Sequence, residues 1–137
     1  MTAGYGSGCA GGGSIFASTA FDPTRPEQGG WIVKTAKVGV INDGPQKPSS
    51  IHLHVGQRPI LAAGNTDGDL AMLQWTAASP HRTLQLVVHH TDGDREYAYD
   101  RDPILGSGTG QILAAAAEHK WTVIDMAADW ATVHPDT

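Results

Sequence analysis

Two copies of the tetrapeptide Thr-Asp-Gly-Asp, at residues 66–69 and 91–94, place acidic side chains directly after apolar segments of the chain. The first copy follows the apolar run 59–63, and the second follows the run 83–89. Short, continuous apolar runs of this kind are typical of buried parallel strands. Because ligands bind at the carboxyl ends of strands in open α/β sheets, the two acidic clusters are expected to face one crevice.

The first cluster is suited to two kinds of role. Asn65, Asp67 and Asp69 offer the hard oxygen ligands that Mg²⁺ prefers, together with water and phosphate oxygens. The same carboxylates could instead cap the helix that the apolar spacing predicts over 67–78. The residues alone leave both roles open.

The second cluster combines histidines with acids. His89 and His90 end the predicted strand and Asp92 follows, so one imidazole should point to each face of the sheet, with the carboxylate in the loop. Imidazole and carboxylate together would suit Zn²⁺, Mn²⁺ or Ni²⁺, which makes these three residues the alternative metal cluster. An ordinary hydrogen-bonded role and general-base duty for a histidine are the other possibilities. Arg95 and Arg101 could bind an anionic substrate or could be surface charges.

Positioning these clusters requires alternating strands and helices. Apolar strand-like runs over 59–63, 83–89 and 121–126 are separated by helical patterns over 67–78 and 111–119. Strands that alternate with helices imply crossovers and a parallel sheet. We therefore predict an α/β domain in which a short parallel sheet is flanked by helices.

The N-terminal part of the chain has a different character. Residues 1–30 are dominated by Gly, Ser, Thr, Ala and Pro, and we predict a Gly-rich loop that is partly ordered at best. The β-branched run 31–41 ends at a turn and predicts a strand or a hairpin, and 49–55 predicts a short helix bearing two histidines. Two regions are thus expected, 1–30 and an α/β domain over 31–137.

Composition narrows the function classes. The chain has 137 residues, a net charge of −5 and 40% hydrophobic residues, which fits one small folded domain. Lys and Arg do not cluster, so a nucleic-acid partner is not expected. Neither a membrane span nor a signal peptide is apparent, and a cytoplasmic protein is expected. Cys9 is the only cysteine, so any metal would be bound through oxygen and imidazole ligands.

The segment 64–73, Gly-Asn-Thr-Asp-Gly-Asp-Leu-Ala-Met-Leu, resembles the acidic fourth motif of haloacid dehalogenase-like (HAD superfamily) phosphatases, in the branch similar to phosphoserine phosphatase. In that pattern a Gly-Asp pair is followed four residues later by a second Asp. Asp69 matches this second acid. Asn65 stands where the family usually has its metal-binding Asp, a departure that removes one charge from the expected Mg²⁺ site.

Lys47, in Gln-Lys-Pro, stands where the same family carries the lysine of its third motif, and the resemblance extends from about Trp31 to Pro135. It implies that this ammonium neutralises the phosphoryl oxygens of a small phosphorylated substrate. We therefore expect Lys47, Asp67 and Asp69 to be catalytic, and Lys47, Thr66 and Arg95 to bind the substrate.

The family's first motif, Asp-x-Asp with its nucleophilic aspartate, has no counterpart at the end of a strand here, and the second motif has no clear counterpart either. The resemblance thus implies a truncated Rossmann-like core. It predicts a metal-assisted phosphoester hydrolase, with metal-activated water or an unassigned Asp or His as nucleophile. The alternative is a non-catalytic α/β fragment or metal-binding module that needs a partner or the missing half.

The same truncation predicts self-association. In the family fold the missing strand lies beside the strand over 59–63, so its loss leaves that strand at an edge and uncovers apolar side chains such as Leu61, Leu86 and Val88. Unpaired edges and large apolar patches favour association. A homodimer or a higher homo-oligomer is therefore expected.

Overall fold

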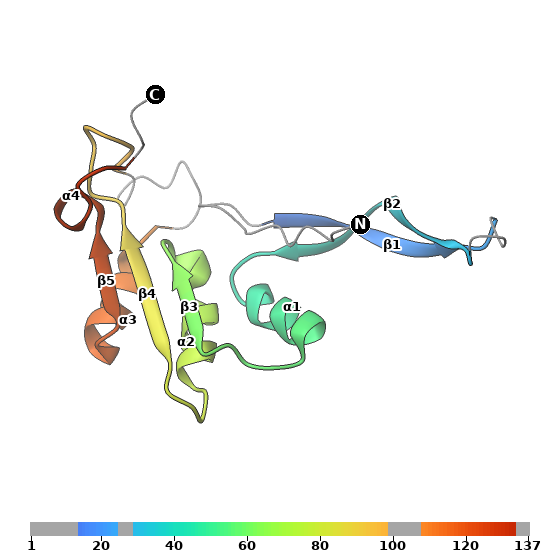
Figure 1. The fold of residues 1–137 in the computed structure, drawn as a ribbon, viewed down its shortest axis with the longest axis horizontal. Coiled ribbons are helices and arrows are strands. Elements are labelled where there is room, and N and C mark those ends of the chain that lie inside the picture. Colours follow the sequence, from blue (N-terminus) through green and yellow to red (C-terminus); the bar gives the residue numbers. More distant parts are fainter. Residues whose placement is uncertain (1–13, 25–28, 99–107, 134–137) are drawn as a thin grey trace.

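The computed structural model describes residues 14–24, 29–98 and 108–133. It contains an α/β body and a two-stranded antiparallel ribbon that extends away from the body (Figure 1). The predicted fold class is confirmed at this level, because the body is a small parallel sheet flanked by helices. None of the helices within the described ranges has the length and apolar character needed to cross a membrane.

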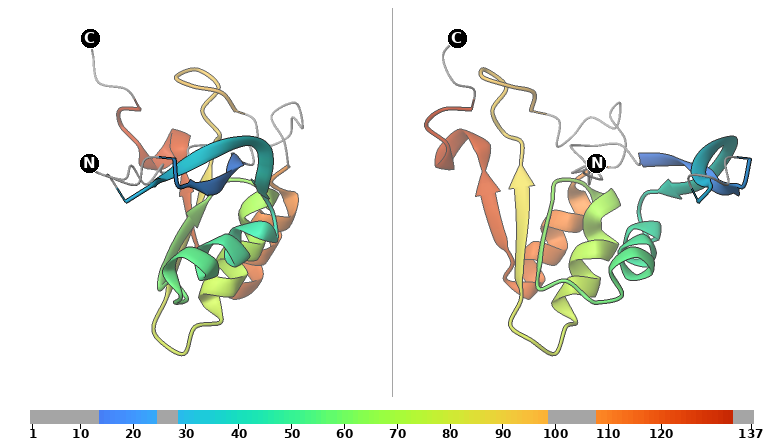
Figure 2. Two further views of the ribbon diagram at one scale, coloured as in Figure 1. Left: turned by 90° about the vertical axis from the view of Figure 1, so that its right-hand side faces the viewer. Right: turned by 45° about the vertical axis from the view of Figure 1, so that its right-hand side comes forward.

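The sheet of the body is built from β3 (Leu61–Gly64), β4 (Leu84–His89) and β5 (Thr122–Asp125), in the order β3-β4-β5. Both strand pairs are parallel. The connections run through α2 (Leu70–Ala77) and α3 (Gly110–His119), and both helices cover the same face of the sheet (Figures 1 and 2). As a result, all three strands end at the same edge.

The core lies between the sheet and these two helices. Side chains that point to this face of adjacent strands pack against apolar residues of the helices, and the cluster consists of Ala62, Leu73, Val87, Ile112 and Ala116. Leu73 and Ile112 have no exposed surface. Burial of one such side chain stabilises the fold by roughly 1.5–3 kcal/mol, so this small cluster fixes the relative positions of β3, β4 and both helices.

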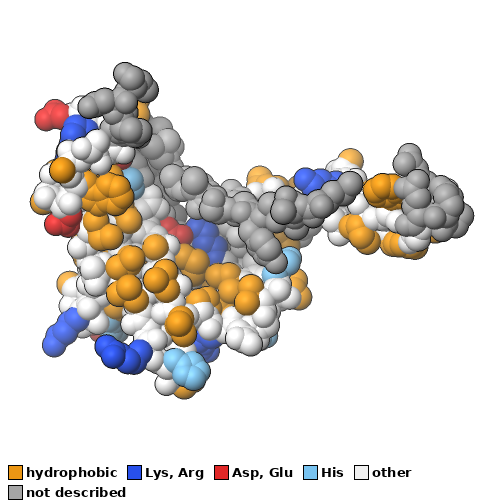
Figure 3. Space-filling model, in the orientation of Figure 1, with side chains coloured by type: hydrophobic (Ala, Val, Ile, Leu, Met, Phe, Trp, Pro, Cys, Tyr) orange, Lys and Arg blue, Asp and Glu red, His pale blue; other side chains and the backbone are white. Residues whose placement is uncertain are grey.

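The opposite face of the sheet is apolar and uncovered within the described residues. Leu61 is 54% exposed and Leu84, its partner in the β3–β4 register, is 43% exposed. Leu86 and Val88 lie on the same face of β4 and are half-buried. Figure 3 shows apolar side chains gathered over this side of the body. β3 also forms one edge of the sheet, as expected.

The ribbon corrects the prediction of a loop over residues 1–30. Ser14–Asp22 forms β1, which pairs antiparallel with β2 (Trp31–Asn42), while residues 1–13 and 25–28 lie outside the described ranges. Gly-rich composition obscured a run of apolar and β-branched residues that gains its order from pairing with β2. The register is irregular near Ala17, where β2 contributes extra residues.

Two further helices complete the body. α1 (Gln46–Val55) begins three residues before the predicted helix over 49–55, because Pro48 is tolerated in a first helical turn. It ends at Gly56, whose φ of 73° is the left-handed conformation typical of a helix C-terminus. α1 packs on α2. α4 (Met126–Asp129) directly follows β5.

Candidate functional site

Five polar residues form a connected group beside the carboxyl ends of β3 and β4, and one of the links runs through a backbone N–H. They come from the first turn of α1, from the loop after β3 and from the loop after β4, and they are Lys47, Asn65, Asp69, His90 and Glu96. The crossover topology brings these segments together although they are distant in the sequence. The group lies at the edge of the sheet where ligands bind in open α/β folds.

Asp69 is the centre of this group. Its Oδ1 accepts a hydrogen bond from Nζ of Lys47 at 2.7 Å, and its Oδ2 accepts from the backbone N–H groups of Asn65 at 3.0 Å and Thr66 at 3.4 Å. Asp69 is only 8% exposed. A buried carboxylate needs such donors, because an unpaired buried charge is strongly unfavourable.

The loop conformation that fixes Asp69 is a capping box. Thr66 is extended and begins the 3₁₀ helix Asp67–Asp69, and Thr66 and Asp69 bond reciprocally to each other's backbone. The capping role left open by the sequence is therefore present. Thr66 is 6% exposed and serves the loop conformation, so the structure gives no support to its expected contact with substrate.

Lys47 links the first turn of α1 to the acidic loop after β3. Besides the bond to Asp69, its ammonium lies 3.8 Å from Oδ1 of Asp43, and its side chain is 19% exposed. It is therefore held between two carboxylates and is not a solvated turn lysine. A cation fixed in this way, with partial access to solvent, can meet an anion without first losing much conformational freedom.

Asp67 has a different structural role from Asp69. Its Oδ1 accepts the backbone N–H of Ile112 at 2.8 Å, and its own N–H donates to the carbonyl of Gly108 at 2.7 Å. Asp67 therefore caps the N-terminal turn of α3 and joins the acidic loop to that helix, where a negative charge is favourable. This capping contact explains why residue 67 is an aspartate, without a catalytic role for its carboxylate.

His90 is held by a carboxylate that sequence reasoning missed. Nδ1 of His90 lies 2.9 Å from Oε1 of Glu96, and both side chains are 16% exposed. Nε2 lies 3.5 Å from Nδ2 of Asn65. Because Glu96 is an acceptor, this contact assigns an N–H to Nδ1, and the neutral tautomer with that N–H has its acceptor lone pair on Nε2. Glu96 lies six residues beyond His90 in the same loop, and no periodicity in the sequence indicates this contact.

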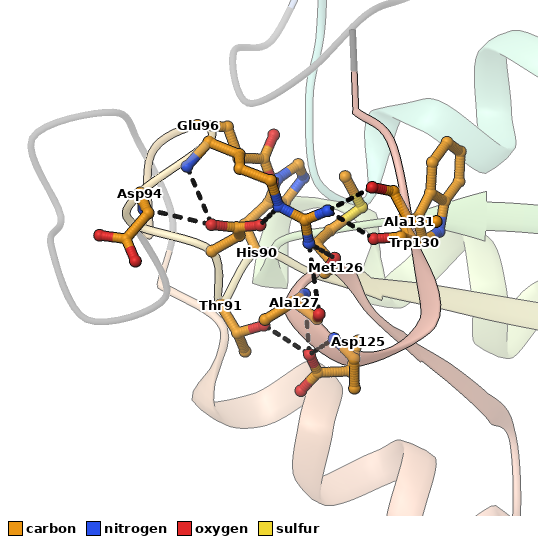
Figure 4. Close-up of polar contacts among 12 residues, drawn as sticks. His90, Thr91, Asp94, Glu96, Asp125, Met126, Ala127, Trp130 and Ala131 are labelled. Carbon is orange, nitrogen blue, oxygen red and sulfur yellow. Dashed lines mark hydrogen bonds and ion pairs between the residues drawn. The ribbon is translucent and has the colours of Figure 1, made fainter.

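Arg95 and Asp92 form a structural anchor for α4. The guanidinium pairs with the buried carboxylate of Asp92. It also donates to four backbone carbonyls in and just after α4, at distances of 2.6–3.2 Å (Figure 4). These carbonyls belong to Met126, Ala127, Trp130 and Ala131. Hydrogen bonds from Arg95, first of all from its backbone N–H, lower the pKa of Asp92. Arg95 therefore binds α4, and the structure gives no support to its expected contact with substrate.

The neighbouring residues Thr91 and Asp125 join β4 to the start of α4. The hydroxyl of Thr91 donates to Oδ1 of Asp125 at 2.6 Å, and the same oxygen accepts the backbone N–H groups of Ala127 and Ala128. The Thr91 hydrogen bond is the largest cause that lowers the pKa of Asp125, with further contributions from these backbone groups and from the charge of His89.

The alternative metal cluster is not assembled. His89 lies near Asp125, His90 contacts Glu96, and Asp92 pairs with Arg95, so the three residues have separate partners. Within the described ranges, no group of three or more His, Cys, Asp or Glu side chains is placed to bind a metal ion.

The donor set of the acidic loop also does not fit the expected Mg²⁺. Both oxygens of Asp69 and one oxygen of Asp67 accept internal hydrogen bonds, and the side-chain amide nitrogen of Asn65 faces His90. Mg²⁺ requires several oxygen ligands in near-octahedral geometry. We therefore derive no step through a metal ion, and a requirement for Mg²⁺, Zn²⁺ or Mn²⁺ stays a prediction from the sequence.

The remaining candidates lie elsewhere or outside the described residues. His52 and His54 diverge on α1, as expected for a helix: His52 meets the ring of Trp75 edge-on, and Nδ1 of His54 lies 2.7 Å from the carbonyl of Ser50. Cys9 and Arg101 fall outside the described ranges. In comparisons with known proteins, no family model matches the chain and no curated protein sequence matches it.

Proposed function

We propose that the site around Lys47 hydrolyses phosphate esters of small molecules. The observation that carries the proposal is the ammonium of Lys47, held 2.7 Å from Asp69 at the carboxyl edge of a parallel sheet. An ammonium has three N–H donors, and Asp69 accepts one of them at hydrogen-bonding distance. The others are suited to the oxygens of an anion that enters this edge.

Phosphate is the anion that the sequence favours. The pair of Lys47 with the segment 64–73 resembles two motifs of HAD-like phosphatases. In phosphoryl transfer the chemistry depends on positioning and on stabilising the charge of the phosphoryl oxygens. Lys47 supplies that stabilisation in the proposed reaction, and Asp69 fixes its position. Water attacks phosphorus, the bond to the ester oxygen breaks, and an alcohol and inorganic phosphate are released.

The test is a steady-state assay on the purified full chain, with p-nitrophenyl phosphate as a monoester and bis(p-nitrophenyl) phosphate as a diester. Each assay is run with EDTA and with added Mg²⁺. The proposal expects turnover that Lys47→Ala lowers strongly and Lys34→Ala retains, because Lys34 lies exposed on β2, in the ribbon. Turnover of Lys47→Ala equal to that of the wild type would refute the proposed role of the site.

A non-catalytic binding module is the second candidate. The bare apolar face of the sheet and the edge position of β3 favour it, because parallel sheets are usually covered on both faces. This candidate predicts that inorganic phosphate raises the melting temperature of the wild type but not of Lys47→Ala, without turnover of either ester. The same two proteins therefore distinguish the two candidates.

A further inference from the structure

We propose that His90, oriented by Glu96, is the general base of this site and takes the proton from the attacking water. The proposal rests on the proposed phosphoester hydrolysis and adds the group that activates the nucleophile. Within the described ranges His90 is the imidazole that joins the connected group of Lys47 and Asp69.

The contact with Glu96 gives the ring one tautomer and one orientation. Oε1 of Glu96 lies 2.9 Å from Nδ1, so the N–H is on Nδ1 and the lone pair is on Nε2. A carboxylate behind an imidazole fixes the tautomer in this way, and it also stabilises the imidazolium that forms after proton transfer. An ordinary surface histidine would have no such partner on the far side of the ring.

The lone pair of Nε2 points towards the acidic loop. Nε2 lies 3.5 Å from Nδ2 of Asn65, which is the upper limit for a hydrogen bond and therefore a weak one. The backbone N–H of Asn65 in turn donates to Asp69, the residue that positions Lys47. Base and phosphate-binding cation are thus joined through two residues at one edge of the sheet.

Both ends of this group are shielded but accessible. The side chains of His90 and Glu96 are each 16% exposed, and those of Lys47 and Asp69 are 19% and 11% exposed. Limited contact with bulk water strengthens electrostatic interactions inside the site. The remaining exposure leaves each of these four side chains in contact with solvent.

The proposed step balances as follows. A water molecule replaces the weak contact of Asn65 and donates its proton to Nε2 as its oxygen forms a bond to phosphorus. The bond between phosphorus and the ester oxygen breaks, and its electron pair leaves with that oxygen. The leaving oxygen takes a proton from solvent on the opposite side of phosphorus, and the imidazolium, paired with Glu96, afterwards releases its proton to solvent. Lys47 offsets the charge on the other phosphoryl oxygens.

Kinetic and spectroscopic measurements together test this assignment. General-base catalysis contributes on the order of 10²- to 10⁴-fold in rate, so His90→Ala is expected to lower kcat by about this factor, and added imidazole is expected to restore part of the loss. His81→Ala is the matched control, because His81 is exposed in the loop before β4. Glu96→Gln is expected to lower kcat with a smaller change in KM.

The spectroscopic measurement does not require activity. Long-range ¹⁵N–¹H correlation spectra are expected to show His90 of the wild type as the Nδ1–H tautomer, and a mixture of tautomers in Glu96→Gln. An Nε2–H tautomer in the wild type would overturn the geometry. Full kcat in His90→Ala, with activity lost in Lys47→Ala, would overturn the role of His90 while leaving the proposed function intact. A wild type without turnover would refute both.

Discussion

Gly64 and Asp69 approach each other so closely that a Cβ atom added to Gly64 would lie 2.4 Å from the Cβ of Asp69. Real Cβ atoms do not approach to this distance, so any larger residue at position 64 must displace the side chain that holds Lys47. The last residue of β3 therefore controls the geometry of the candidate site through packing alone.

Gly64→Ala is accordingly expected to lower the free energy of unfolding by about 1–3 kcal/mol, the usual cost of an overpacked position. Gly110→Ala is the matched control, because a Cβ there meets nothing within 4 Å. That residue opens α3, where Ala is favoured over Gly by up to about 1 kcal/mol. Urea unfolding of both variants checks the prediction. Equal stabilities would show that Asp69 can move without cost.

Lys47→Ala is expected to lower kcat on the order of 10²- to 10³-fold, because a preorganised charge is lost where charge develops in the transition state. KM should change much less, since that charge is largest in the transition state. Lys47→Arg should recover little of the rate, because a planar guanidinium differs in shape and length from an ammonium. Unchanged kcat in Lys47→Ala would contradict the assignment.

The pairing of Lys47 with Asp69 can be measured separately from activity. Because both side chains are mostly buried, a double-mutant cycle with Lys47→Met and Asp69→Asn is expected to give a coupling energy of about 0.5–3 kcal/mol. Thermal or urea unfolding supplies the four stabilities. A coupling near zero would show that Lys47 and Asp69 do not interact in solution.

Arg95→Lys is expected to destabilise the C-terminal part of the body. An ammonium cannot reproduce the five N–H donors of a guanidinium, so Asp92 and several carbonyls of the α4 segment would lose partners. The expected loss is about 1–3 kcal/mol. Hydrogen exchange should show faster exchange of the α4 amides than in an Arg82→Lys control, which changes an exposed arginine. Equal exchange would argue against the anchoring role.

Much of the α/β body could be predicted from the sequence. The run 83–89 and the helical pattern 111–119 correspond to β4 and α3 within one residue, because each is a compact apolar segment with clear turn residues at its ends. β1 was missed because its order comes from pairing with β2 and not from local composition. A strand of that kind depends on a distant segment that no local pattern reveals.

The site could be predicted only in part. The link between Lys47 and the acidic loop came from the resemblance to a family, since 22 residues separate Lys47 from Asp69 and no spacing rule connects them. Glu96 and the anchoring role of Arg95 were missed because both depend on how the loop after β4 folds. The partners of Arg95 are mostly backbone carbonyls, which the sequence does not distinguish.

Thr91→Val is expected to weaken the fold in a way that depends on pH. The hydroxyl of Thr91 is the largest cause that holds the pKa of Asp125 below its ordinary value of 3.8. A carboxylate whose pKa is depressed by folding stabilises the protein above the unfolded pKa of about 3.9, and that stability is lost as pH falls through the folded pKa. The difference in melting temperature between wild type and variant should therefore be largest near neutral pH.

Once the pH has fallen below the lowered folded-state pKa, the carboxyl of Asp125 is protonated in both states, so the pH-dependent part of this difference should disappear. Thermal unfolding from neutral pH to about pH 2.5 measures it. Ser in place of Thr91 is the control, because it keeps the hydroxyl that bonds to Asp125. A difference between wild type and Thr91→Val that is independent of pH would show that lost packing, and not the charge of Asp125, explains the effect.

Self-association through the bare face of the sheet is the final prediction, and we propose a homodimer. The described side chains that the strand registers place on this face carry no charge; they are Leu61, Ala63, Leu84, Leu86, Val88, Thr122 and Ile124. An uncharged apolar face is complementary to an identical face about a two-fold axis, whereas a charged partner would lose hydration there without compensation. Two sheets packed face to face form a stable layered architecture.

Leu84→Lys tests this surface, because Leu84 lies on the central strand β4 and a charge there affects the face without changing the edge at β3. Sedimentation velocity at micromolar concentration is expected to show a dimer for the wild type and a folded monomer for the variant. Leu53→Lys is the control, since Leu53 is 78% exposed on α1 and away from the sheet. A wild-type monomer would contradict the proposed dimer. A dimer that persists in Leu84→Lys would instead place the interface at the edge of β3 or on the ribbon. Eight large apolar side chains are exposed on the ribbon: Ile15, Phe16, Phe21, Trp31, Ile32, Val33, Val38 and Ile41.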